Sequence, residues 1–92
     1  MTVIRYDPHV PEIRFQGHAG AGEAGSDPVC AALSILMYTL CAALGDEGTE
    51  RCFGDGCCRI RGGERGPYEV VAAGLRLLAE EKPAYVRLEV KR

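Results

Sequence analysis

The stretch PVCAALSILMYTLCAALG, residues 28–45, decides the fold that we predict for this chain of 92 residues. It carries no charge, and its apolar side chains recur every three or four positions, as on the buried face of a helix. Asp27 before it is a good N-cap, Pro28 suits the first helical position, and Gly45 is a typical helix stop. A buried helix over 28–44 is therefore predicted. Its expected core-facing stripe consists of Val29, Leu33, Leu36, Leu40 and Ala43.

The uncharged run is long enough that a membrane helix has to be considered. However, it is rich in Ala, Ser, Thr and Cys, and two acidic residues follow it without a basic flank. We therefore expect a helix buried in a protein core, and no association with a membrane. No charged segment followed by an apolar stretch opens the chain, so we expect the protein in the cytoplasm, with reduced cysteines.

Strands are predicted on both sides of this helix, because apolar and polar residues alternate there. Residues 2–7 and 12–18 form a first hairpin, with His18 at the end of its second strand on the polar side. In 49–62 the sequence GDG marks the turn of a second hairpin. The last segment, 84–92, alternates again. Its inward side chains are expected to be Val86, Leu88 and Val90.

A second helix is predicted to begin near Pro67 and to end before Pro83. The order β-β-α-β-β-α-β indicates one α+β domain over residues 1–92, a mostly antiparallel sheet packed with two helices. A net charge of −2 gives no overall attraction to nucleic acid, so we expect no direct nucleic-acid binding. The expected buried side of the second helix consists of Val70, Val71, Gly74, Leu75 and Leu78.

One histidine and one cysteine flank the glycine-rich loop before the first helix. Cys30 falls in the first helical turn, where unpaired N–H groups and the helix dipole favour a thiolate. The eleven residues between His18 and Cys30 are enough to bring the imidazole back over the helix start. This pair has the composition of a nucleophile and its general base. The alternative is that Cys30 is a small buried residue and His18 a polar surface residue.

Two neighbours of Cys30 could support it. Asp27 can accept a hydrogen bond from the Cys30 N–H as helix cap, or it could orient His18. Ser34 lies one turn beyond Cys30 on the same helix face, where it could bond the thiolate or the substrate, or bond back to the Cys30 carbonyl. Backbone N–H groups at the helix start are the expected partners of an oxyanion.

The segments GHA (17–19) and GSDPVCAALS (25–34) resemble the ribosomal-processing cysteine protease family Prp. Its signature is Gly-His-Ala, an eleven-residue gap from His to Cys, and Gly-x-Asp-x-x-Cys-Ala-Ala-x-Ser. The element order predicted here also fits the family. The chain departs from it in having no aromatic residue in the loop, and Pro28 where an aliphatic residue is common. The matching positions are Gly17, His18, Ala19, Gly25, Asp27, Cys30, Ala31, Ala32 and Ser34.

The resemblance implies an endopeptidase that removes a short N-terminal extension from a large-subunit ribosomal protein, cutting after an aromatic residue. It further implies a homodimer. We expect no cofactor and no metal. Cys30 would be the nucleophile and His18 the general base and acid, with Asp27 and Ser34 in support. The loop glycines would belong to a mobile segment that orders over the peptide. These glycines are Gly20, Gly22 and Gly25.

Two other functions compete with this one. The first is a thiol-based metal or redox module, because the resemblance gives no role to Cys52, Cys57 and Cys58. Cys52 could face Cys57 or Cys58 across the second hairpin, and Cys41 could add a fourth thiolate for zinc, although C-x4-C-C is not the usual ligand spacing. The second is a ribosome-associated binding protein without activity, which would not need the His18 and Cys30 pair.

Overall fold

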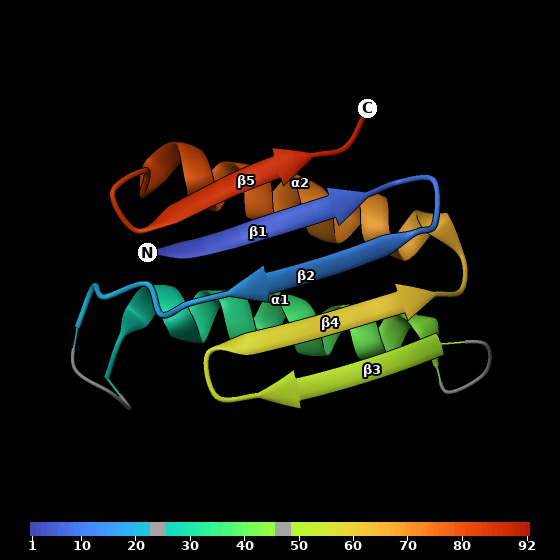
Figure 1. The fold of residues 1–92 in the computed structure, drawn as a ribbon, viewed down its shortest axis with the longest axis horizontal. Helices are drawn as coiled ribbons and strands as arrows, with labels where there is room; N and C mark the ends of the chain where they lie inside the picture. Colours follow the sequence, from blue (N-terminus) through green and yellow to red (C-terminus); the bar gives the residue numbers. More distant parts are fainter. Residues whose placement is uncertain (23–25, 46–48) are drawn as a thin grey trace.

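The structure is a computed structural model that describes residues 1–22, 26–45 and 49–92. Strands and helices follow one another in the predicted order β-β-α-β-β-α-β (Figure 1). Within the described residues no helix is both long and apolar enough to cross a membrane. The elements are β1 (Thr2–Asp7), β2 (Glu12–Gln16), α1 (Pro28–Leu44), β3 (Thr49–Gly54), β4 (Cys57–Gly62), α2 (Arg65–Glu81) and β5 (Val86–Val90).

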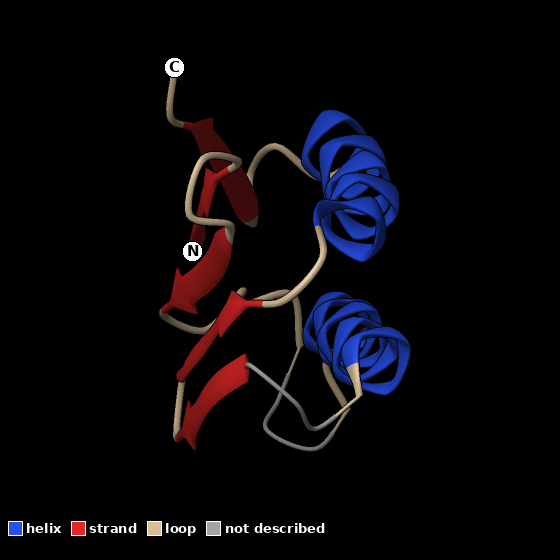
Figure 2. Ribbon diagram, turned by 90° about the vertical axis from the view of Figure 1, so that its right-hand side faces the viewer, coloured by secondary structure: helices blue, strands red, loops and turns tan. Residues whose placement is uncertain are grey.

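The strands form one sheet in the order β3-β4-β2-β1-β5. Neighbouring strands are antiparallel except for β1 and β5, which run parallel because α2 carries the chain back along the sheet. Both helices lie on the same face, and the other face of the sheet is left open (Figure 2). This is the predicted α+β architecture, with both predicted hairpins formed as β1–β2 and β3–β4.

The core lies between the sheet and the helices. In the sheet, the alternation of side chains directs Ile4, Ile13 and Ile60 inward, and all three are fully buried. The register places Ile13 opposite both Tyr6 and Ile60, so the inward residues of three adjacent strands form a continuous row. The helices contribute Val29, Leu33, Met37, Leu40, Tyr68, Val71, Ala72 and Leu75.

The buried stripe of α1 differs from the prediction near its centre and its end. Met37 is buried, whereas Leu36 is only half-buried and Ala43 is exposed. Leu36 points toward α2, where a Cβ on Gly74 would lie 2.9 Å from its Cδ2 atom. Leu36 therefore fills the contact between the helices, which needs glycine at position 74, and Met37 takes its place against the sheet.

Three predictions for the C-terminal half are wrong in detail. α2 begins at Arg65, ahead of Pro67, because a proline in the first turn of a helix gives up no intrahelical hydrogen bond. Val70 is 73 % exposed, and the fully buried Tyr68 occupies the core instead, with its hydroxyl donating to the Gly62 carbonyl at 2.6 Å. Burial declines along the edge strand β5, so that Val90 is 41 % exposed.

Candidate active site

Asp27 organises the start of α1. Its Oδ1 atom accepts hydrogen bonds from the backbone N–H groups of Val29, at 2.9 Å, and Cys30, at 3.1 Å. Its Oδ2 atom accepts from the N–H of Ala21 at 3.0 Å, so one buried carboxylate fixes both the helix start and the preceding loop. The predicted cap is present, and its partners are on the helix and the loop rather than on His18.

The environment of Asp27 also sets its ionisation. Burial acts to raise the pKa of the carboxyl, but the hydrogen bonds from Cys30, Val29 and Ala21 outweigh it, and the pKa lies below the ordinary value of 3.8. The side chain of Cys30 makes a further, smaller contribution that lowers the pKa of this carboxyl.

Cys30 faces a cavity of about 210 Å³. The thiol is half-buried in the first turn of α1, and Ser34 lies one turn further along the same cavity wall. Within the described part of the chain the Ser34 hydroxyl makes no hydrogen bond, whereas Thr39, on the same helix, donates to the Ile35 carbonyl. The back-bonded alternative for Ser34 is thus not adopted, and its hydroxyl faces the cavity. The lining residues are Thr2, Phe15, Gly17, His18, Cys30, Leu33, Ser34, Gly54 and Gly56.

His18 reaches this cavity from the sheet side. β2 ends at Gln16, opposite Cys57, and the next residue, Gly17, donates its N–H to the Gly56 carbonyl at 2.7 Å. The imidazole consequently lies beside the turn between β3 and β4, and its Nε2 atom is 3.4 Å from Oδ1 of Asp55. The fold thus brings His18, Cys30 and Ser34 to one cavity, as the sequence predicts.

The glycine-rich loop is described only in part. Gly20 and Gly22 are exposed, and Gly25 lies outside the described residues. The predicted mobility of this loop stays a prediction.

The start of α1 does not supply an oxyanion site in the expected way. Asp27 takes the N–H groups of Val29 and Cys30 through its side chain and that of Ala31 through its carbonyl, at 3.1 Å. Pro28 has no N–H. Every backbone donor of the first turn is therefore engaged, and the Ser34 hydroxyl is a cavity-facing donor of α1 that remains for a ligand.

A second cavity of about 160 Å³, lined largely by aromatic rings and sulfur-containing side chains, adjoins the first. The two share Phe15, Ser34 and Gly54 in their walls. Tyr38 and Phe53 stack at its edge, with ring centroids 6.0 Å apart, although both rings are exposed. An apolar side chain of a ligand bound at Cys30 therefore has a neighbouring hollow that it can enter.

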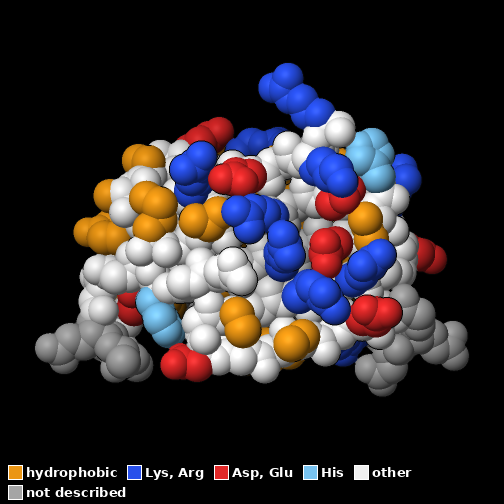
Figure 3. Space-filling view, in the orientation of Figure 1, with side chains coloured by type: hydrophobic (Ala, Val, Ile, Leu, Met, Phe, Trp, Pro, Cys, Tyr) orange, Lys and Arg blue, Asp and Glu red, His pale blue; other side chains and the backbone are white. Residues whose placement is uncertain are grey.

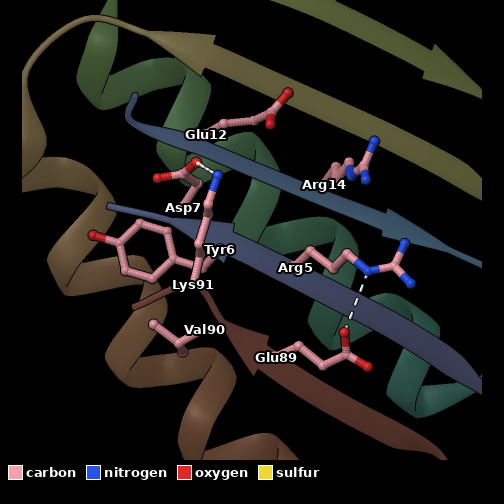
Figure 4. Close-up of a pocket in the computed structure, with 8 residues that line it drawn as sticks. All are labelled: Arg5, Tyr6, Asp7, Glu12, Arg14, Glu89, Val90 and Lys91. Carbon is pink, nitrogen blue, oxygen red and sulfur yellow. Dashed lines mark hydrogen bonds and ion pairs between the residues drawn. The ribbon is translucent and has the colours of Figure 1, made fainter. Parts of the chain in front are cut away.

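Another cavity, of about 360 Å³, lies elsewhere, on the open face of the sheet (Figure 4). Its walls carry ion pairs between Arg5 and Glu89, at 3.3 Å, and between Lys91 and Asp7, at 3.6 Å. Basic and acidic side chains are interspersed over this face (Figure 3). None of the predicted site residues lines this cavity, so the smaller cavity at α1 is the candidate site.

Comparison with protein families decides the class of the molecule. The profile described as cysteine protease Prp matches residues 1–62, which include β1 to β4 and all of the predicted dyad. The chain belongs to the Prp family. It is accordingly a cysteine protease, as expected from the motif around His18 and Cys30. A search of curated proteins finds no match.

Solved structures share the whole Prp fold. A ribosomal processing protease Prp from S. aureus, in complex with a covalently linked product peptide, is 24% identical, with a TM-score of 0.84 over 99% of this chain and 100% of that chain. The same protease with a substrate peptide gives 23% identity and a TM-score of 0.77 over the same shares of the two chains. SMU.848 from Streptococcus mutans is 25% identical, with a TM-score of 0.69 over 97% of this chain and 90% of that chain.

Other residues of this Prp site were missed from the sequence. The GDG segment was recognised only as a turn, yet Asp55 and Gly56 contact His18, and Phe53 lines the second cavity. The contacts depend on the register between β2 and β4, which pairs Gln16 with Cys57. A turn signal fixes the local backbone but does not tell which distant side chain will lie on it.

The remaining cysteines do not adopt the arrangement that a metal or redox module would use. Cys52 lies opposite Arg59, and neither Cys57 nor Cys58 faces it, since these pair with Gly54 and Phe53. All five cysteines are free thiols. In residues 1–22, 26–45 and 49–92, no three His, Cys, Asp or Glu side chains are grouped so as to hold a metal ion.

Proposed function

We propose that this Prp family member is an endopeptidase in which Cys30 and His18 form the catalytic dyad. The observation that carries the proposal is the shared cavity, to which α1 contributes Cys30 and Ser34 and the end of β2 contributes His18. A cysteine thiol needs a base before it can attack, and His18 is a base that lines the same cavity as Cys30.

The proposed reaction proceeds by acyl transfer. The Cys30 thiol gives its proton to the His18 imidazole while Sγ attacks the carbonyl carbon of the scissile peptide bond. His18 then returns the proton to the departing amine, which leaves a thioester on Cys30. Water, deprotonated by His18, hydrolyses the thioester and restores the thiol. The Ser34 hydroxyl is proposed to hydrogen-bond the substrate carbonyl, because the backbone donors of the first helical turn are engaged.

The proposed substrate is a large-subunit ribosomal protein with a short N-terminal extension, which places the reaction in the cytoplasm. Its support is the Prp family match, together with the fold shared with a protease named for ribosomal processing. Cleavage after an aromatic residue is supported by the second cavity next to Cys30, where Phe15, Tyr38 and Phe53 can pack against a ring. A homodimer is also proposed, from the resemblance alone.

A peptide series tests the substrate. Two peptides with the sequence of such an extension and its junction would differ only in Phe or Ala before the cleaved bond. We expect cleavage of the Phe peptide at one bond, seen by mass spectrometry, and much slower cleavage of the Ala peptide. Equal cleavage of both would contradict the aromatic preference.

Analytical ultracentrifugation at micromolar concentration tests the homodimer, and a purely monomeric boundary would refute it.

A further inference from the structure

The turn between β3 and β4 makes two contacts with the imidazole of His18. Oδ1 of Asp55 lies 3.4 Å from Nε2, the nearest acidic contact that the described structure gives this ring. Gly56, at φ +67°, lies under the same nitrogen, because a Cβ built there would be 2.9 Å from Nε2. The turn is tied to the histidine segment by the 2.7 Å hydrogen bond from the Gly17 N–H to the Gly56 carbonyl.

These contacts distinguish the two nitrogens of the ring. Nε2 faces the turn, where the Asp55 carboxylate is available as acceptor and where Gly56, which has no Cβ, leaves room for the ring. A neutral imidazole that donates Nε2–H to Asp55 has its lone pair on Nδ1. At 3.4 Å the contact is an ion pair rather than a hydrogen bond, and a small rotation of either exposed side chain is needed to bring Nε2–H to the carboxylate.

We propose that Asp55 is a positioning residue for His18: it accepts Nε2–H and so leaves Nδ1 as the base for the Cys30 thiol. This inference rests on the proposed dyad. The proton balance is simple, because the thiol proton moves to Nδ1 while the Nε2 proton stays where it is, shared with Asp55. The imidazolium formed in this step lies next to a carboxylate, which favours it electrostatically. Asp55 itself takes no proton.

The expected effect is modest in the free protein. Both side chains are well exposed, at 65% for His18 and 99% for Asp55, and an exposed ion pair is screened by water. Removal of the carboxylate is therefore expected to slow modification of Cys30 by iodoacetamide about 2- to 5-fold. Asp55→Asn is expected to recover part of this loss, since its amide oxygen still accepts from Nε2–H.

The test is a double-mutant cycle of Asp55→Ala and His18→Ala. The measured quantity is the rate at which iodoacetamide modifies Cys30 at pH 7, followed by peptide mass spectrometry, and no peptide substrate is needed. Glu80→Ala, which removes an exposed carboxylate from α2, is the matched control. Thermal unfolding of every variant shows whether the fold is retained.

The proposal predicts that Asp55→Ala slows modification of Cys30 in the wild-type background and has no effect once His18 is Ala. An equal slowing in both backgrounds, or none in either, would overturn it. If either of these two outcomes is found but His18→Ala alone still slows modification of Cys30, only the role of Asp55 is refuted and the proposed dyad is retained. If His18→Ala leaves the rate unchanged, the dyad fails as well, so the two failures can be told apart.

Discussion

The backbone N–H of Cys30 donates a 3.1 Å hydrogen bond to Oδ1 of Asp27, so the cap of α1 and the proposed nucleophile are directly joined. The other oxygen of the carboxylate holds the N–H of Ala21. The position of the thiol is thus determined by a residue that has a structural role whatever the chemistry. Helix cap and loop anchor are combined in one side chain.

Asp27→Ala is expected to lower both stability and cleavage rate. Loss of the cap should reduce Tm by about 4–8 °C, the shift that corresponds to one good N-cap in a domain of this size. Asp27→Asn keeps one oxygen that can accept from the helix N–H groups, but its amide nitrogen cannot accept from the N–H of Ala21. Its Tm should therefore fall less than that of Asp27→Ala, although the contact with Ala21 is lost. Calorimetry and kcat/KM of the two variants check this, and an unchanged Tm for Asp27→Ala would speak against the cap as a stabilising element.

The lowered pKa of Asp27 predicts a pH dependence of stability. The ordinary value is 3.8 and the folded value is lower, so the unfolded chain takes up a proton first as the pH falls. The stabilisation is complete well above 3.8 and is lost as the pH drops through the folded pKa. Because Asn does not titrate, the Tm difference between wild type and Asp27→Asn should shrink from pH 6 to pH 3. A difference that stays constant over this range would contradict the assignment.

Gly56→Ala is expected to impair cleavage far more than a comparable change elsewhere. Its Cβ would displace the His18 ring, since only 2.9 Å separates it from Nε2. Gly45→Ala is a matched control, because Gly45 also has positive φ, of +72°, but no atom within 4 Å of the added Cβ. Both variants carry backbone strain and should lose similar stability, while only Gly56→Ala should lose most of its kcat/KM. Equal activity of the two would show that the ring does not depend on the turn.

The free thiols should differ widely in reactivity. Burial raises the pKa of Cys58 from 9.0 to about 12, with smaller contributions from the nearby thiols of Cys41, Cys57 and Cys52. Cys58 is therefore protonated and inaccessible at pH 8, whereas Cys52 is exposed. Alkylation of the native protein at pH 8 should modify Cys52 completely before Cys58 reacts, as read by mass spectrometry. Early modification of Cys58 would mean that the core opens readily.

The raised pKa of Cys58 also predicts how stability changes at alkaline pH. Between about pH 9 and pH 12 the unfolded Cys58 thiol ionises while the folded one does not, so stability falls as the pH rises through this range.

The sequence predicted the features of this protein that depend on local chemistry. Asp27 and Pro28 mark the start of α1 through capping preferences, and period-two alternation marks the strands, so the element order followed directly. The proposed dyad was identified because His18 and Cys30 stand in a recognisable local motif. These signals need no knowledge of long-range packing.

Features that depend on packing between distant elements could not be predicted in the same way. Leu36 and Met37 have similar apolar character, and only the approach of α2 through Gly74 decides which of them meets the sheet. The contact of His18 with Asp55 likewise follows from the β2–β4 register. The backbone N–H groups at the start of α1 are already hydrogen-bonded, so they do not form the expected oxyanion site. Which N–H groups are occupied depends on the partners that each oxygen of the Asp27 carboxylate takes in the folded chain.

The most direct test of the account is cleavage of an extended ribosomal-protein peptide by wild type, Cys30→Ala and Cys52→Ala, followed by mass spectrometry. Cys52 is an exposed thiol outside the candidate cavity, so its replacement controls for the loss of a cysteine as such. We predict a single cut after an aromatic residue by wild type and Cys52→Ala, and none by Cys30→Ala with the fold intact. Cleavage by Cys30→Ala at the wild-type rate would contradict the assignment of Cys30 as the nucleophile.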